Sequence, residues 1–237
     1  LVQRLSRAEG KALEARSAQT DEELLKAAVE RGITQYVVIG AGFDSFAQRR
    51  PAYARALEVF EVDHPATQGM KRQQLAACGV IASDRLHFVA ADLATETLTS
   101  ALTRSAYQPT QPTFFSWLGV TMYLARDANL ATLRAIASCA PPGSELVFSY
   151  MDQAVLDTDP AKSPAFDALR RQVASIGEAF QSGFDPRTLS AMLHETGLQL
   201  LADEGGDQLL ARYDNTGRNG LQAVAAARVA HVRSPSL

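Results

Sequence analysis

Apolar and polar positions follow two patterns along the chain: short runs rich in β-branched and aromatic residues are separated by longer segments with helical periodicity. This alternation is typical of an α/β protein in which a parallel sheet is covered by helices on both faces. The runs expected to form strands are 36–40, 57–63, 86–91, 113–118, 145–150, 198–202 and 221–232. The segments expected to form helices are 21–31, 65–77, 127–138, 166–180 and 186–195. We therefore expect a mostly parallel, seven-stranded sheet.

The pattern changes after Met151, where a polar stretch with two prolines precedes the last two predicted helices. We interpret this insert, at about residues 152–196, as a helical cap on the sheet and not as a separate domain. Residues 1–237 are accordingly expected to form one domain, a size that is ample for a substantial core.

The charge balance argues against several classes of function. The 237 residues carry 23 basic and 26 acidic side chains, a formal net charge of −3, whereas nucleic acids and anionic membranes are bound by a concentrated basic face. No run approaches the roughly 18 apolar residues of a membrane helix. The first ten residues also lack the apolar stretch of a signal peptide. We expect no nucleic-acid or membrane partner, and a location in the cytoplasm.

The two cysteines, Cys78 and Cys139, are too few for a disulfide framework or a four-thiolate zinc site. They also form no CxxC pair. We interpret both as small apolar residues and expect no metal site.

Residues suited to binding a ligand follow three successive predicted strands. Gly40-Ala41-Gly42 follows the first, Asp63 ends the second and Asp92 follows the third. Ligands of open α/β sheets bind at the carboxyl ends of the strands, so these residues are expected to converge on one crevice. Glycine lets the backbone approach a ligand closely. Asp63, 23 positions after Gly40, is placed to accept hydrogen bonds from ribose hydroxyls.

The ligand of this crevice is expected to contain adenosine. A dinucleotide site normally has a third glycine, which packs the following helix close to the pyrophosphate. Ser45 stands at that position, and no basic residue follows until Arg49. The sequence therefore favours S-adenosyl-L-methionine, which carries no phosphate, over NAD.

Longer stretches around these residues resemble the leucine carboxyl methyltransferase family, including its bacterial branch of S-adenosylmethionine-dependent O-methyltransferases. The resemblance covers about residues 15–221, and its stretches are QYVVIGAGFDSFAQRRP (35–51), FEVDHPATQGMKRQQL (60–75), VAADL (89–93), WLGVTMYL (117–124) and GEAFQSGFDP (177–186). The second stretch is the most specific. The resemblance implies a Rossmann-like class I methyltransferase fold, with S-adenosyl-L-methionine as the cofactor.

The resemblance also implies roles for single residues. Gly40 would line the cofactor, Asp63 would hold the ribose, and Asp92 with the backbone of Leu93 would recognise adenine. Arg16 would bind the methionine carboxylate. The predicted cofactor-binding residues are Arg16, Gly40, Ala41, Gly42, Asp63, His64, Asp92 and Leu93.

One position departs from the family pattern. Many members carry a glutamate before the glycine of the fourth stretch, where it contacts the methionine end of the cofactor, and Leu118 stands there in this chain. A backbone carbonyl near Gly40 or another side chain would then have to bind the ammonium group.

The expected activity is methyl transfer to a carboxylate or hydroxyl oxygen of a small metabolite. Such a displacement depends mainly on orientation, so no catalytic side chain is required, and none of His64, Tyr123 and His194 is favoured as a base. Two alternatives stay open: an NAD-dependent oxidoreductase, and a catalytically silent protein that binds S-adenosylmethionine. The apolar cap residues that could line an acceptor pocket, or equally belong to the core, are Phe180, Phe184 and Met192.

Overall fold

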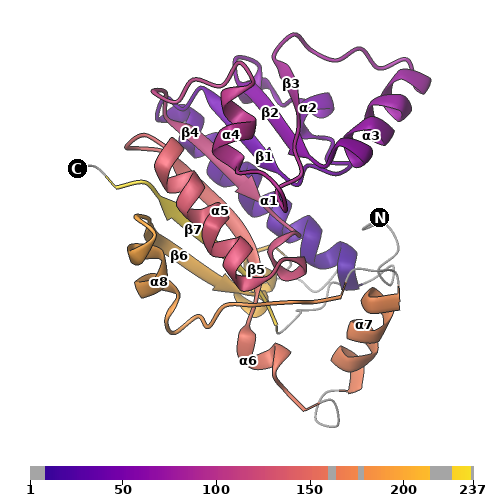
Figure 1. Ribbon diagram of the computed structural model, residues 1–237, viewed down its shortest axis with the longest axis vertical. Helices are drawn as coiled ribbons and strands as arrows, with labels where there is room; N and C mark the ends of the chain where they lie inside the picture. The colour runs from indigo at the N-terminus through magenta and orange to yellow at the C-terminus, as the bar shows by residue number, and fades with distance from the viewer. Residues whose placement is uncertain (1–8, 160–163, 176–178, 214–225, 236–237) are drawn as a thin grey trace.

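The computed structural model describes residues 9–159, 164–175, 179–213 and 226–235 (Figure 1). The side chains of residues 9–19 and 164–165 lie outside this description. Within the described residues, helices cover both faces of one sheet.

The sheet has seven strands in the order β3-β2-β1-β4-β5-β7-β6. Neighbours from β3 to β5 are parallel, whereas β7 runs antiparallel to both β5 and β6. The strands are β1 (Gln35–Ile39), β2 (Glu58–Asp63), β3 (Leu86–Ala90), β4 (Thr113–Trp117), β5 (Glu145–Met151), β6 (Gln199–Gly205) and β7 (Ala227–Arg233). The expected α/β fold with a mostly parallel seven-stranded sheet is thus confirmed.

Two layers of helices enclose the sheet because its central strands are apolar on both faces. Every residue of β1, β4 and β5 is buried, as is usual for strands between two helical layers. One layer, which we call the α1 face, consists of α1 (Glu9–Glu30), α2 (Phe46–Arg49), α3 (Pro65–Ala77) and α9 (Gly206–Tyr213). The opposite layer, the α5 face, consists of α4 (Leu98–Thr103), α5 (Arg126–Cys139) and α8 (Leu189–Glu195). Figure 1 shows α4 and α5 in front of the sheet and α1 behind it.

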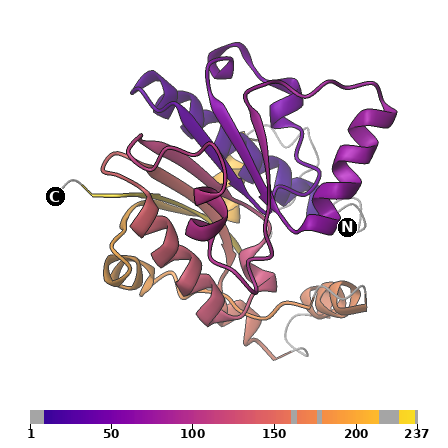
Figure 2. The ribbon, with the colours of Figure 1, turned by 45° about the horizontal axis from the view of Figure 1, so that its top comes forward.

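The predicted cap region begins at the carboxyl end of β5. The short helix α6 (Gln153–Leu156) follows the strand directly, and α7 (Pro164–Ser175) comes next. In Figures 1 and 2, α7 stands away from the sheet, whereas α8 packs against it. Within this segment α7 therefore projects from the sheet and α8 belongs to its helical layer. The role of the segment as a cap stays a prediction.

Several predicted boundaries were wrong. The first helix starts at Glu9 and not at residue 21. The predicted helix 166–180 ends at Ser175, and residues 176–178 lie outside the described residues. The helix expected from residue 186 starts at Leu189, because Asp185 first forms a turn that binds the Arg187 N–H at 2.9 Å. The last strand spans Ala227–Arg233, and residues 221–225 of its prediction lie outside the description.

Four helices lie outside the predicted helical segments. These helices, α2, α4, α6 and α9, are short, so none shows enough turns of apolar periodicity to stand out. The start of α4 does carry a local cue, because the Thr97 hydroxyl accepts the N–H of Ser100 at 3.1 Å as an N-cap.

The described residues form neither a membrane-spanning helix nor a cluster of metal-ligating side chains. In the described part of the chain, no helix is both long and apolar enough to cross a membrane. The same residues contain no group of three or more His, Cys, Asp or Glu side chains that could hold a metal ion.

Candidate functional site

The carboxyl ends of β1, β2 and β3 lie side by side at one edge of the sheet. Ile39 is opposite Val62 in the first pair, and Asp63 is opposite Ala90 in the second. Since all three strands are parallel, the segments that follow them emerge on the same side. The structure therefore brings together the three strand ends that the sequence singled out, residues 40–42, 63–64 and 91–93. We call them the adenosine edge, after the ligand predicted for them.

The glycine loop after β1 requires glycine at its first position. Gly40 has φ +71°, and a Cβ placed there would lie 2.5 Å from Cγ2 of Val120. Gly42 also has a positive φ, +46°. The N–H groups of Gly40 and Ala41 both donate to the carbonyl of Val62, at 2.8 and 3.2 Å. The loop is thus held flat against the end of β2, where its backbone can approach a ligand.

Asp63 connects the glycine loop to the start of α3. One of its carboxylate oxygens accepts the N–H of Gly42, and the other accepts the N–H of His64 at 2.6 Å. A carboxylate oxygen can accept more than one hydrogen bond. Asp63 is half-buried, so both oxygens are fixed by the backbone and still able to accept hydroxyl donors such as those of ribose.

His64 has a structural task at this edge. Its Nδ1 accepts the N–H of Ala66 at 3.2 Å and so caps the first turn of α3, which has Pro65 at its first position. The imidazole is exposed. Because Nδ1 is engaged in the cap, His64 is a poor candidate for a general base.

Asp92 forms a turn after β3. Its Oδ1 accepts the N–H of Ala94 at 3.0 Å, and its carbonyl accepts the N–H groups of Thr95 and Glu96 at 2.9 Å. No hydrogen bond to Oδ2 is formed by another described residue. Leu93 packs partly against the apolar cluster of the α5 face. This arrangement leaves one oxygen of Asp92 without a hydrogen-bond partner among the described residues, and its role in binding adenine stays a prediction.

The remaining predicted positions have different outcomes. Arg16 lies on α1, but its side chain is outside the description, so its role stays a prediction. Leu118 packs against the apolar cluster of the α1 face. An apolar residue at this position therefore fills part of the core.

Two buried acids near the adenosine edge were missed by the sequence analysis. Burial raises the pKa of Asp21 on α1 to about 7 and that of Glu61 on β2 also to about 7. Glu61 forms a buried ion pair with Lys71 of α3 at 2.5 Å. Asp21 precedes Leu25 and Ala28 by four and seven residues, so helical spacing places it on the buried face of α1. That spacing was the available cue.

The predicted cap is joined to the ends of β4 and β5 by residues 181–184. The N–H and the side-chain amide of Gln181 donate to the carbonyls of Met122 and Tyr123, at 2.8 and 2.7 Å. The N–H of Phe184 donates to the carbonyl of Met151, and that of Gln153 to the carbonyl of Phe184, both at 3.0 Å. These hydrogen bonds fix one strip of the cap across the carboxyl ends of two strands.

A stack of three aromatic rings lies beside this strip. The rings of Tyr123 and Phe180 are 5.8 Å apart, and those of Phe180 and Phe166 are 6.2 Å apart. All three residues are half-buried. Phe184, by contrast, is 1% exposed and belongs to the core. Met192 and Phe180 are both half-buried and pack against apolar clusters, so of the three apolar cap candidates burial places only Phe184 wholly in the core.

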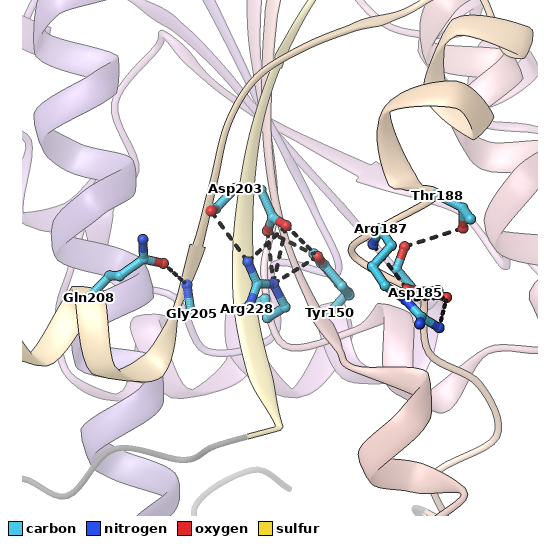
Figure 3. Close-up of polar contacts among 8 residues, drawn as sticks. All are labelled: Tyr150, Asp185, Arg187, Thr188, Asp203, Gly205, Gln208 and Arg228. Carbon is cyan, nitrogen blue, oxygen red and sulfur yellow. Dashed lines mark hydrogen bonds and ion pairs between the residues drawn. The ribbon is translucent and has the colours of Figure 1, made fainter.

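A polar network ties the far strands of the sheet together (Figure 3). The Tyr150 hydroxyl donates to Asp203 at 2.9 Å, and Arg228 binds the same carboxylate at 2.9 Å through Nη2. The three residues come from β5, β6 and β7. Burial raises the pKa of Tyr150 well above its usual value. This network therefore links β5, β6 and β7 through side-chain hydrogen bonds.

Comparison with known proteins identifies relatives of the chain. The leucine carboxyl methyltransferase family matches residues 4–137. YktD of Bacillus subtilis is named as an S-adenosyl-L-methionine-dependent methyltransferase. It is 32% identical to this chain over 210 residues, which cover 89% of this chain and 68% of YktD. The chain spans half the length, or less, of several mycobacterial relatives that it matches.

Solved structures share the fold at low sequence identity. A DUF574 family protein from Streptomyces avermitilis aligns with a TM-score of 0.68 at 17% identity, over 99% of this chain and 88% of that one. The magnesium protoporphyrin IX methyltransferase of Synechocystis, solved with bound S-adenosylhomocysteine, aligns with a TM-score of 0.56 at 14% identity, over 96% and 86%. The expected Rossmann-like methyltransferase fold is thereby confirmed.

Proposed function

The chain belongs to the leucine carboxyl methyltransferase family of S-adenosylmethionine-dependent methyltransferases, and on this premise we propose that it methylates a carboxylate or hydroxyl oxygen of a small molecule. Membership in this family argues against the alternative of an NAD-dependent oxidoreductase, which Ser45 had already disfavoured. The silent binding protein remains the competing proposal.

Asp63 is the observation that carries the proposed mode of cofactor binding. Its two oxygens are each anchored by a backbone N–H, from Gly42 and His64. Both oxygens retain capacity for the two hydroxyls of a ribose. Gly40 provides the second element of fit, because any side chain there would collide with Val120. The residues present therefore fit an adenosine ligand without phosphate.

The binding roles follow from these contacts. When bound, the cofactor supplies a methyl group on a positively charged sulfur. Asp63 would hold the ribose, Asp92 would accept a hydrogen bond from the adenine amine, and the loop 40–42 would line the cofactor. The contribution of the chain to the rate is orientation, since an in-line displacement needs aligned reactants and no protein nucleophile.

The acceptor is proposed to bind beside the aromatic stack of Tyr123, Phe166 and Phe180. This stack lies at the end of β4, next to the strip that joins the cap to the sheet. Apolar walls with few polar groups are typical of small-molecule pockets. Because His64 is engaged in a helix cap and His194 is exposed on α8, an acceptor that is already ionised, such as a carboxylate, is favoured.

The partner is accordingly a small molecule, and the near-neutral charge gives no reason to infer binding to nucleic acid. The Synechocystis structural neighbour, named for magnesium protoporphyrin IX, also acts on a small molecule. We retain the cytoplasm as the proposed location.

Calorimetry followed by turnover tests the proposal. Titration with S-adenosylhomocysteine should show binding, and titration with NADH should show none; the reverse result would remove the proposed function. Turnover of methyl-labelled S-adenosylmethionine is then measured against carboxylic and phenolic acceptors of similar size. Binding without label transfer to either class would support the silent alternative.

A further inference from the structure

The helix α3 is attached to the sheet by polar residues and not by an apolar face. Its buried residues are Gln68 and Lys71, whereas Met70 is 44% exposed. The structure describes all of α3, and none of its residues belongs to an apolar cluster of the core. A surface helix normally docks through an apolar stripe. The placement of α3 on β2 therefore depends on the bonds that these polar side chains form.

Glu61 of β2 receives both of these bonds. Its carboxylate forms the buried ion pair with Lys71 at 2.5 Å, and its carbonyl accepts Nε2 of Gln68 at 3.1 Å. Glu61 is 1% exposed, and its Oε1 has no hydrogen-bond partner among the described residues. Moving either partner of such a pair away would leave a buried charge uncompensated. The ion pair therefore fixes α3 against β2 at one place.

The same side of α3 carries the contact that anchors Asp63. His64, Gln68 and Lys71 are spaced by four and three residues, so they follow one side of the helix. The N–H of His64 donates to one oxygen of Asp63 at 2.6 Å, and the carbonyl of His64 accepts the N–H of Gln68 at 3.0 Å. Glu61 and Asp63 are two residues apart on β2, so their side chains point to the same face of the sheet. A shift of α3 relative to β2 would consequently move the donor that orients Asp63.

Charge provides a second link between the ion pair and the adenosine edge. Burial raises the pKa of Glu61 to about 7, and the charges of Asp44 and Asp63 raise it as well, whereas Lys71 lowers it. Among the described residues, no ion pair joins Asp44 or Asp63 to a basic side chain. The ammonium group of Lys71 therefore offsets part of the negative charge that gathers beside Asp63.

We propose that Glu61 and Lys71 are positioning residues for cofactor binding, because their ion pair holds α3 so that Asp63 presents a fixed carboxylate to the ribose hydroxyls. The inference rests on the proposed function, in which Asp63 binds the ribose. Neither residue of the pair has to touch the cofactor, since its effect passes through the N–H of His64 to the orientation of Asp63. Loss of the pair should therefore weaken binding only for ligands that carry ribose hydroxyls.

Calorimetry with two ligands separates this role from a general effect on stability. S-adenosylhomocysteine carries both ribose hydroxyls, and its 2′,3′-dideoxy analogue carries neither. The wild-type chain should bind the first ligand at least about tenfold more tightly than the second, as expected for hydrogen bonds to a charged group. We call this ratio of the two affinities the ribose preference.

The main variant is Glu61→Leu/Lys71→Met, which replaces the ion pair by apolar residues of similar volume. Such replacements of buried pairs often leave stability unchanged, but apolar contacts are not directional and would let α3 shift. The ribose preference should fall by about fivefold or more, because a displaced carboxylate forms poorer hydrogen bonds. Affinity for the dideoxy analogue should stay within about twofold, since no hydroxyl contact is lost. Equal losses for both ligands, or an unchanged preference, would overturn the inference.

The variant Asp63→Ala completes a double-mutant cycle. If the pair acts through Asp63, adding Glu61→Leu/Lys71→Met to Asp63→Ala should change affinity for S-adenosylhomocysteine by less than about twofold. A loss as large as in the wild-type background would overturn the inference. The matched control is Glu204→Leu/Arg212→Met, which removes another strand–helix ion pair, between β6 and α9. It should leave the ribose preference unchanged, and a similar fall in this control would also overturn the inference.

The variant Gln68→Met decides the question if the pair variant does not fold. Methionine is a good helix former, and the substitution removes only the bond to the Glu61 carbonyl. The ribose preference should then fall about two- to threefold, and an unchanged preference would overturn the inference. Equal wild-type affinity for the two ligands would overturn it as well. Failure of the wild type to bind S-adenosylhomocysteine would instead refute the proposed function itself, and this inference with it.

Discussion

The adenosine edge and the cap side of the sheet are built by different kinds of contact. At the edge, side chains bind the backbone of neighbouring loops: Asp63 links residues 42 and 64, and Asp92 closes its own turn. On the cap side, residues 181–184 form hydrogen bonds through both backbone and side chains, and stacked rings lie beside them. The edge thus depends on single carboxylates at strand ends, whereas the cap adds stacked and buried rings to its hydrogen bonds. Substitutions should separate the two regions.

The largest effect is expected at Phe184, whose ring is fully buried against Phe148 and Tyr150 and lies under the guanidinium of Arg126. Phe184→Ala should lower the free energy of unfolding by about 3–5 kcal/mol, as for other buried rings. Urea unfolding measures this cost. Well below its unfolding midpoint, the variant should still bind S-adenosylhomocysteine normally. A large loss of affinity in the folded variant would show that the two regions are not independent.

Gly40→Ala should destabilise the edge by about 2–4 kcal/mol, through its left-handed backbone and a collision with Val120. Gly79 is a matched control, since its φ of +67° is similar and nothing lies within 4 Å of its Cβ position. Gly79→Ala should lower the free energy of unfolding only by the cost of its left-handed backbone, about 1–2 kcal/mol. Equal effects of the two substitutions, measured by urea unfolding, would mean that the collision with Val120 does not lower stability.

Asp63→Ala should weaken S-adenosylhomocysteine binding by about 1.5–3 kcal/mol, because the ribose hydroxyls lose a charged acceptor. Calorimetry gives the affinity, and circular dichroism checks the fold. The exposed acid Asp84 serves as the control, and Asp84→Ala should leave binding unchanged. Unaltered affinity in a folded Asp63 variant would place the cofactor elsewhere.

The smallest effect on stability is expected at Phe180, which is half-buried in the aromatic stack. Phe180→Leu keeps apolar volume and should cost less than about 1.5 kcal/mol. Cofactor affinity should not change, but KM for the acceptor should rise. An unchanged KM, measured with whichever acceptor the label-transfer assay identifies, would remove the stack from the acceptor site.

The same contrast explains what the sequence could predict. Gly40, Asp63 and Asp92 stand at strand ends, where the backbone itself demands glycine or a turn-forming acid, so their positions follow from the strand pattern. The stack of Tyr123, Phe166 and Phe180 joins distant segments through apolar contacts that have no fixed spacing. Sequence patterns cannot distinguish such rings from core residues, as Phe184 demonstrates.

The errors in the predicted helices have a related reason. The extension of the first helix to Glu9 lies beyond its apolar stripe, and α4 and α9 are too short to show periodicity. Asp21 was overlooked because an acid at the apparent start of a helix looks like a solvated first turn. Only its spacing from Leu25 and Ala28 indicates burial.

The position of β7 has a consequence for how the chain is made. β7 lies between β5 and β6, although β6 is synthesised first. On the ribosome, β6 must therefore wait without a partner strand until residues 227–233 have emerged. The slowest step of assembly is then expected to be the closing of this last gap, after the adenosine edge has already formed.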